Sequence, residues 1–313
     1  MSDGSAKPEG VRHLARWAVR RLWYSFFRYH PYYYMGALQW ATMGGEESER
    51  FQRVFELVRK APLSLRAYSL RFYLDELYYG RYAHSTTLPE PNRLRWSGPL
   101  GVAYHQEMLE NYMRHPEEFE REYGPLLARV QEALREAPFE YVVEIGCGNG
   151  LLIERVAALA PEASATFVGL DISPETLALT RERCAGSRVE YHCCNTLQEF
   201  LERGRPASVL VVANGTATFF TSSEFVNLLT WLRSNVPRGA VVVRDITHLE
   251  AEREQRSRPA GGYVFHHNYG FLLAQAGLND IRCQYEPVPD IPLQAVVASA
   301  SWEHARQAKP SSP

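Results

Sequence analysis

Five short apolar runs alternate with longer amphipathic segments over the C-terminal two thirds of the chain. The runs have the length of buried strands, and the segments between them are long enough for helices. This alternation predicts an α/β fold. The predicted strands are Tyr141–Ile145, Ala165–Asp171, Arg188–Cys194, Ala207–Ala213 and Gly239–Asp245.

Capping residues and two further strands continue the pattern. Ser173 and Pro174 are predicted to open a helix after the second strand, because serine caps a helix N-terminus and proline fits its first turn. Asn268 is predicted to cap a helix over Tyr269–Ala276 in the same way. The last two predicted strands, on either side of a proline-rich link, are Asp280–Tyr285 and Leu293–Trp302.

The first predicted strand leads into a glycine-rich turn and then a helix. Glu144 lies two residues before Gly146, and Gly148 and Gly150 follow at alternate positions. Such a turn lets a ligand lie against bare backbone at a helix N-terminus. The spacing differs from the Gly-x-Gly-x-x-Gly of dinucleotide sites. A carboxylate beside the turn suits a cationic or amino-bearing ligand better than a pyrophosphate.

Asp171 ends the second strand, where a carboxylate is placed to accept ribose hydroxyls. Together with the glycine turn, it resembles the first motifs of class I S-adenosylmethionine-dependent methyltransferases, over about residues 125–302. The resemblance implies that Asp171 binds both ribose hydroxyls and that Glu144 supports the amino group of the cofactor. Asn195 stands where the family often has Asp, and its side-chain oxygen can accept the same hydrogen bond from the adenine amino group.

The resemblance also implies the fold and the cofactor. The fold is a Rossmann-like, doubly wound seven-stranded sheet that ends in an antiparallel hairpin, with an N-terminal helical cap. The cofactor is S-adenosyl-L-methionine, and S-adenosyl-L-homocysteine is the product. The expected cofactor contacts are Glu144, Gly146, Cys147, Gly148, Gly150, Asp171, Ile172, Asn195, Thr196 and Asn214.

The first hundred residues follow a different pattern. From Val11 to Phe26, apolar residues recur on one helical face, and arginines line another. A basic amphipathic helix before a tyrosine-rich cluster is also typical of a membrane interface. We favour a cap because an aromatic face is normally buried. The predicted domains are a disordered tail at 1–10, a helical cap at 11–100, the catalytic domain at 101–302 and a disordered tail at 303–313.

Within these domains, most of the chain before the first strand is predicted to be helical. A loop is expected over Arg81–Gly101, which contains three prolines. The predicted helices are Glu47–Lys60, Leu65–Tyr79, Gly101–Glu122 and Tyr123–Ala137.

Composition narrows the class of partner and compartment. The formal net charge is −2, so no global field attracts nucleic acid. The five cysteines lack zinc-ligand spacing, and no metal site is predicted. These cysteines and the lack of a signal sequence favour a reducing cytoplasm. Only three of the 34 basic Lys and Arg residues are lysine, which fits a bacterial genome of high GC content.

Methyl transfer to a hydroxyl needs a base, and histidine is the usual one. His267 is the first choice, because it precedes the helix after strand five. The other candidates are His266, His248, His105 and the carboxylate of Asp245. The residues expected to meet the acceptor are Tyr104, Asn214 and Gly215.

The sequence thus predicts S-adenosylmethionine-dependent methylation of a small molecule, at oxygen rather than at nitrogen or carbon. One alternative keeps the cofactor as a scaffold, in a non-methylating cyclase or a binding module. Another is a membrane-associated lipid or quinone methyltransferase. The acceptor and the oligomeric state stay open.

Overall fold

The computed structural model describes residues 31–60, 64–67, 69–70, 73–74, 90–255, 257–259, 264–288 and 293–304. The chain divides into two compact units, residues 1–80 and 81–313. The predicted amphipathic helix from Val11, the tail at 1–10, residues 305–313 and much of the predicted helix Leu65–Tyr79 lie outside the described residues. The predicted C-terminal tail begins too early, because Glu303 is the last residue of a strand. The division does not decide whether residues 11–100 act as a cap, which stays a prediction.

In the first unit, helix α2 (Pro31–Thr42) is followed by α3 (Glu47–Lys60), the helix expected at those residues. The rings of Trp40 and Phe51 join the two helices, with centroids 4.9 Å apart and both side chains buried. Gly36 of α2 lies so close to the backbone of Ser69 that a Cβ there would stand 2.2 Å from its carbonyl oxygen. Close backbone contact therefore requires glycine at this position.

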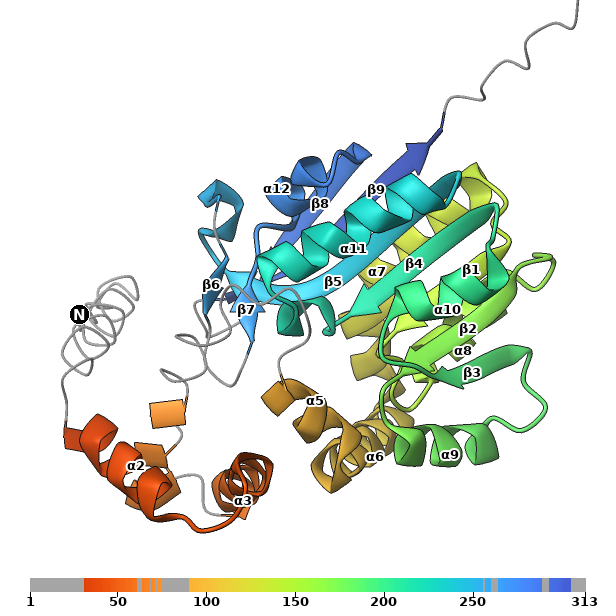
Figure 1. The fold of residues 1–313 in the computed structure, drawn as a ribbon. Coiled ribbons are helices and arrows are strands. Elements are labelled where there is room, and N and C mark those ends of the chain that lie inside the picture. The colour runs from red at the N-terminus through yellow and green to blue at the C-terminus, as the bar shows by residue number, and fades with distance from the viewer. Residues whose placement is uncertain are drawn as a thin grey trace, which may run out of the picture. The chain divides into compact units, whose positions relative to one another are not determined.

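The second unit is built on a seven-stranded sheet of order β3-β2-β1-β4-β5-β9-β8 (Figure 1). Strands β1 to β5 run parallel, β9 pairs antiparallel with β5, and β8 pairs antiparallel with β9. The predicted doubly wound sheet and its terminal hairpin are confirmed. The strands are β1 (Tyr141–Ile145), β2 (Thr166–Asp171), β3 (Val189–Cys193), β4 (Ser208–Asn214), β5 (Arg238–His248), β8 (Asn279–Pro287) and β9 (Leu293–Glu303).

Helices cover both faces of this sheet (Figure 1). Helices α10 (Leu197–Gly204), α11 (Ser222–Asn235) and α12 (Tyr269–Gln275) pack on one face. Helices α7 (Pro116–Glu136), α8 (Leu151–Leu159) and α9 (Pro174–Arg183) contribute to the core on the other.

Strand β5 shows how its side chains alternate between the two cores. Val241 and Val243 belong to the core on the α11 side, whereas Ala240 and Val242 belong to the core on the α7 side. Alternation of this kind is the period of a strand buried on both faces.

The predicted helix caps are confirmed. The Ser173 hydroxyl accepts a hydrogen bond from the Thr176 backbone N–H at 3.1 Å. The Asn268 side-chain oxygen accepts one from the Phe271 N–H at 3.0 Å. Each satisfies a backbone donor that the first helical turn leaves free.

The segment before the sheet contains more helix than its prolines suggest. Part of the predicted loop is α5 (Glu90–Ser97), and α6 (Pro99–Arg114) begins at once after it. Pro116 starts α7, so the predicted boundary between helices near residue 122 lies instead at His115. The loop prediction failed because proline is compatible with the first turn of a helix. Among the helices within the described ranges, none is long and apolar enough to cross a bilayer.

Candidate functional site

A cavity of about 340 Å³ opens at the carboxyl ends of β1, β2, β4 and β5. Ligands bind outside this edge in open parallel sheets, because loops and helix N-termini converge there. The glycine turn and the ends of β2 and β3 form one half of the cavity, which we call the cofactor half. The ends of β4 and β5, with α5, α6 and the start of α7, form the other, which we call the acceptor half.

The glycine turn has the backbone that the sequence requires. Gly146, Gly148 and Gly150 all have left-handed φ angles, of 69°, 49° and 74°. A Cβ on Gly146 would lie 2.4 Å from the Thr216 hydroxyl, and one on Gly148 would lie 2.3 Å from the His105 ring. Conformation and space therefore both demand glycine at these two positions.

Asp171 fixes this turn to the end of β2. Its Oδ2 accepts a hydrogen bond from the Gly148 N–H, and its Oδ1 accepts one from the Ser173 N–H, each at 2.9 Å. The carboxylate is buried but lines the cavity. Each oxygen can accept a further hydrogen bond, so the group can hold two ligand hydroxyls while it holds the turn.

Glu144 brings a second buried carboxyl group to the cofactor half. Its side chain is 3% exposed, and Oε2 has no hydrogen-bond partner within the part of the chain that the structure describes. Burial raises the pKa of Glu144 well above its ordinary value, and the nearby Asp171 charge raises it further, while a backbone hydrogen bond from Ile153 lowers it. An orphaned carboxyl oxygen in a cavity wall fits an amino-bearing ligand, since buried polar groups are normally paired.

Eight of the ten predicted cofactor contacts line the cavity. Gly148 and Gly150 are not in its wall, and they shape the turn instead. Thr196 also caps α10, since its hydroxyl accepts a hydrogen bond from the Glu199 N–H at 3.1 Å. The eight lining residues are Glu144, Gly146, Cys147, Asp171, Ile172, Asn195, Thr196 and Asn214.

Aromatic side chains dominate the acceptor half. Trp96 lies at the centre of one cluster, with ring centroids 5.0 Å from Phe219 and 5.3 Å from Tyr104. Tyr104 and Gly215, both expected to meet the acceptor, line the cavity. Sequence reasoning did not assign the other aromatic rings to the site. Four of them come from α5, α6 and α7, and two come from the segment after β4. The six rings are those of Trp96, Tyr112, Phe119, Tyr123, Phe219 and Phe220.

Sequence reasoning also missed a polar cluster at the end of β5. The Arg244 guanidinium lies 3.2 Å from the carboxylate of Glu122 and donates a hydrogen bond to the Asn214 side-chain oxygen at 3.3 Å. Tyr112 donates to Glu122 Oε2 at 2.7 Å, and the Tyr123 hydroxyl lies 3.2 Å from that of Tyr112. All five residues line the cavity. The one signal in the sequence was an arginine directly after a run of apolar strand residues.

Of the predicted bases, His105 lines the cavity. Burial lowers the pKa of His105, and the Asp171 charge opposes this shift. Asp245 does not line the cavity, because it points to the opposite face of β5 from Arg244. There its Oδ2 accepts a hydrogen bond from the Tyr269 hydroxyl of α12 at 2.7 Å. Burial raises the pKa of Asp245 to about 6.

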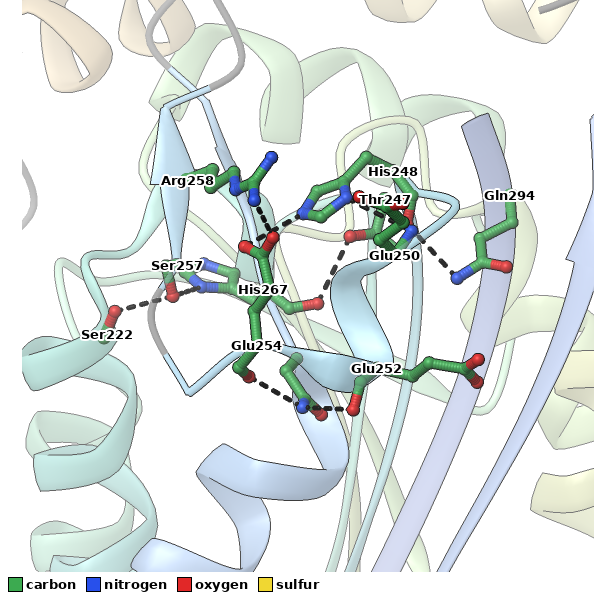
Figure 2. A network of polar contacts seen from close by, with 11 residues as sticks. Ser222, Thr247, His248, Glu250, Glu252, Glu254, Ser257, Arg258, His267 and Gln294 are labelled. Carbon is green, nitrogen blue, oxygen red and sulfur yellow. Dashed lines mark hydrogen bonds and ion pairs between the residues drawn. The ribbon is translucent and has the colours of Figure 1, made fainter. Parts of the chain in front are cut away.

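The other three histidines do not line the cavity. His248 and His267 belong to a separate polar network (Figure 2). His267, the first choice for the base, is 1% exposed. Its Nε2–H donates to the Phe220 carbonyl at 3.1 Å, and its Nδ1 accepts from the Ser257 hydroxyl at 2.5 Å. Burial lowers the pKa of His267 to about 4. Both ring nitrogens thus serve the packing of this loop.

His248 and His266 stack beside each other, with ring centroids 5.6 Å apart. His248 lies 3.4 Å from Glu254, which also pairs with Arg258 (Figure 2). Burial lowers the pKa of both histidines, that of His266 to about 4. The structure therefore brings only His105, among the five predicted catalytic residues, to the cavity wall.

Residues 142–255 match the family described as "Methyltransferase domain". The chain is 33% identical over 152 residues to trans-aconitate 2-methyltransferase of Methylobacterium nodulans, over 48% of this chain and 54% of that protein. It is 46% identical over 46 residues to an uncharacterized phycocyanin operon protein W of Pseudanabaena tenuis, over 15% of this chain and 42% of that one. The chain therefore spans about half the length of the curated relatives it matches.

Among solved structures, the chain is similar to 1,6-didemethyltoxoflavin-N1-methyltransferase of Burkholderia thailandensis, with 1,6-didemethyltoxoflavin and S-adenosylhomocysteine bound. The similarity covers 65% of this chain and 88% of that one, with 18% identity and a TM-score of 0.42.

Proposed function

We propose that this protein, which carries a class I S-adenosylmethionine-dependent methyltransferase domain, transfers the cofactor's methyl group to an oxygen of a small-molecule acceptor. The observation that carries the proposal is the orphaned Oε2 of Glu144, beside three left-handed glycines and the carboxylate of Asp171. These groups fit an amino acid joined to a nucleoside. The matched relative, trans-aconitate 2-methyltransferase, supports an acceptor of small-molecule size.

Each polar residue of the cofactor half binds a different part of the cofactor. Asp171 accepts the ribose hydroxyls, Glu144 meets the amino group, and Asn195 accepts from the adenine amino group. S-adenosylmethionine, when bound, supplies an electrophilic methyl group. The protein then has to orient the acceptor toward that methyl group and exclude water.

The acceptor half supports oxygen as the nucleophile. Arg244 places a buried cation in its wall, beside the more exposed carboxylate of Glu122, and this cation attracts an oxygen anion but repels a protonated amine. The aromatic rings of α5, α6 and α7 line much of the remainder of this half. Such walls favour a small molecule that is largely apolar with a few polar groups.

Two measurements test the proposal on the full chain. Calorimetric titration with S-adenosylhomocysteine should show one binding site per chain. Incubation with methyl-labelled S-adenosylmethionine and candidate acceptors should then transfer the label. Lack of binding would contradict the proposal. Binding without any transfer would favour the alternative in which the cofactor is only a scaffold, in a non-methylating cyclase or a binding module.

A further inference from the structure

We infer that the acceptor is a planar or aromatic carboxylic acid, that Arg244 binds its carboxylate, and that the product is a methyl ester. This inference rests on the proposed function and names its substrate class. It comes from the polar cluster around Arg244 and from the positions of the titratable side chains around the cavity.

Arg244 is a buried cation that faces the acceptor half. Arg244 is 8% exposed. Its side chain lies on the α7 side of β5, because side chains alternate along a strand and those of Ala240 and Val242 lie on that side. Burying a guanidinium costs free energy unless anions or strong acceptors surround it. An arginine in a cavity wall is therefore a costly feature that a bound anion would offset.

In the described part of the chain, Arg244 is held by two polar contacts and by the Tyr123 ring, whose centroid lies 5.2 Å from the guanidinium carbon. Its contacts with Glu122 at 3.2 Å and with Asn214 at 3.3 Å are both longer than the roughly 2.7–2.9 Å of a strong charge-assisted hydrogen bond. Glu122 is also held by the Tyr112 hydroxyl, and its side chain is 39% exposed. A guanidinium has five N–H donors in a planar fork that matches a carboxylate. A ligand carboxylate can thus bind Arg244 without displacing Glu122 from Tyr112.

Arg244 also lies beside the cofactor half. It pairs in register with Asn214 of β4, and Ala213 of β4 pairs with Ile145 of β1, directly before the glycine turn. Neighbouring strands lie about 4.8 Å apart, so Arg244 stands about two strand spacings from that turn. A carboxylate bound to Arg244 therefore lies in the same cavity as the cofactor.

A carboxylate nucleophile agrees with the positions of the titratable side chains. A carboxylic acid with an ordinary pKa near 4 is ionised at neutral pH, so no base has to remove a proton. His105 lies over Gly148 in the cofactor half, Asp245 faces α12, and His267 is buried in its own network. In the described part of the acceptor half, the charged side chains are the Arg244–Glu122 pair.

The reaction is balanced without any further reactant. A lone pair of the carboxylate oxygen forms the new bond to the methyl carbon as the carbon–sulfur bond breaks, and that electron pair stays on sulfur. The products are a neutral methyl ester and the thioether S-adenosylhomocysteine. One negative and one positive charge cancel, which a cavity lined by aromatic rings favours because opposite charges attract more strongly at low dielectric.

Binding to the complex with S-adenosylhomocysteine tests the inference directly. The probes are benzoate, cinnamate and indole-3-acetate, each compared by calorimetry with its primary amide and its primary alcohol. We expect at least one carboxylate to bind at least tenfold more tightly than both of its neutral counterparts. If no carboxylate does so, the inference is wrong.

Two variants separate recognition by Arg244 from a merely structural role. Glu122→Gln removes the competing anion, so it should increase affinity for the carboxylate several-fold. In the double variant with Arg244→Gln and Glu122→Gln, no charge of this pair is left unpaired, and the preference for carboxylate should disappear. S-adenosylhomocysteine should bind both variants within about threefold of the wild type. Retained carboxylate preference in the double variant would overturn the role of Arg244.

The product gives an independent readout. With methyl-tritiated cofactor and the acid that binds best, alkali should release the label as volatile methanol, because methyl esters hydrolyse in base. Label that remains in the product after alkali would show transfer to another atom and would overturn the inference. If the protein does not bind S-adenosylhomocysteine, the proposed function itself is wrong. If it binds the cofactor but the label is stable to alkali, only the carboxylate inference is wrong.

Discussion

Asp171 is the single residue on which the cofactor half depends most. It holds Gly148 and Ser173 through their backbone N–H groups and has acceptor capacity left for a ribose. Asp171→Ala should weaken S-adenosylhomocysteine binding by at least tenfold, because each charge-assisted hydrogen bond contributes roughly 1.5–3 kcal/mol. Calorimetry measures the change. Asp171→Asn should also bind more weakly than the wild type, since its amide nitrogen would face one of the two backbone N–H donors. Equal affinity of the Ala variant and the wild type would contradict the assignment.

Glu144 should make the ligand-free protein less stable as the pH rises. A carboxyl group whose folded pKa is raised binds more protons in the folded state, so stability is lost from its ordinary unfolded pKa, near 4.3, upward. Glu144→Gln removes this penalty. The variant should therefore gain in melting temperature relative to the wild type between pH 5 and pH 8, while its affinity for S-adenosylhomocysteine falls.

The control for Glu144 is Glu190→Gln on β3, whose side chain is 59% exposed. Thermal denaturation of the two variants and the wild type at both pH values gives the comparison. A difference between Glu144→Gln and the wild type that does not change with pH would show that the buried carboxyl is not the source of the effect.

At the scale of elements, helix α6 and the glycine turn should be energetically coupled. Gly148→Ala meets two costs, the left-handed φ of 49° and the contact with the His105 ring of α6. Gly186→Ala meets only a φ of 87°, with open space around the new Cβ. The left-handed conformation costs roughly 1–2 kcal/mol for an alanine, so Gly148→Ala should lower the free energy of unfolding by more than Gly186→Ala does.

In a background that carries His105→Ala, Gly148→Ala should lower the free energy of unfolding only by the amount that the left-handed backbone costs. Urea denaturation of the single and double variants forms a double-mutant cycle. Additive effects of Gly148→Ala and His105→Ala would show that the His105 ring does not contact the turn in solution.

The alternation along β5 shows what the sequence can and cannot decide. The glycine turn, Asp171 and the caps were predictable, because each is a local pattern that fixes its own backbone. The direction of Arg244 and Asp245 was not, since a strand with both faces buried has no polar side to set its phase. Asp245 was predicted to face the acceptor, but this position belongs to Arg244. Glu122 joins Arg244 from a helix over 100 residues earlier, and only the fold brings them together.

The histidines show the same limit. His266 and His267 precede a helix after strand five, and that position alone suggested a base. Their burial depends on how residues 251–255 lie against the start of α12, where the Asn268 side chain donates to the carbonyl oxygens of Glu252 and Glu254. A catalytic role for His267 remains a prediction, and its contacts with Phe220 and Ser257 make a structural role the expected result of its replacement.

At the scale of the whole molecule, the division of the chain at residue 80 leads to a prediction about truncation. Trp96 of α5 and Tyr104 of α6 line the cavity, and both belong to the unit 81–313. A chain that starts at Arg81 should bind S-adenosylhomocysteine with nearly wild-type affinity. A chain that starts at Gly101 lacks Trp96, which contacts Phe219 and Tyr104 in the acceptor half. It should be poorly soluble, or should bind the cofactor without turnover.

Turnover of the chain that starts at Arg81 then decides the role of residues 1–80. If these residues help to form a cap over the cavity, as their amphipathic and aromatic pattern indicates, their removal should lower turnover while cofactor affinity stays the same, because an open site admits water. Calorimetry and label transfer on the two truncated chains and the full chain provide the comparison. Full turnover in the chain that starts at Gly101 would show that neither the first unit nor α5 is needed, and that the acceptor is enclosed by α6, α7 and the strand ends alone.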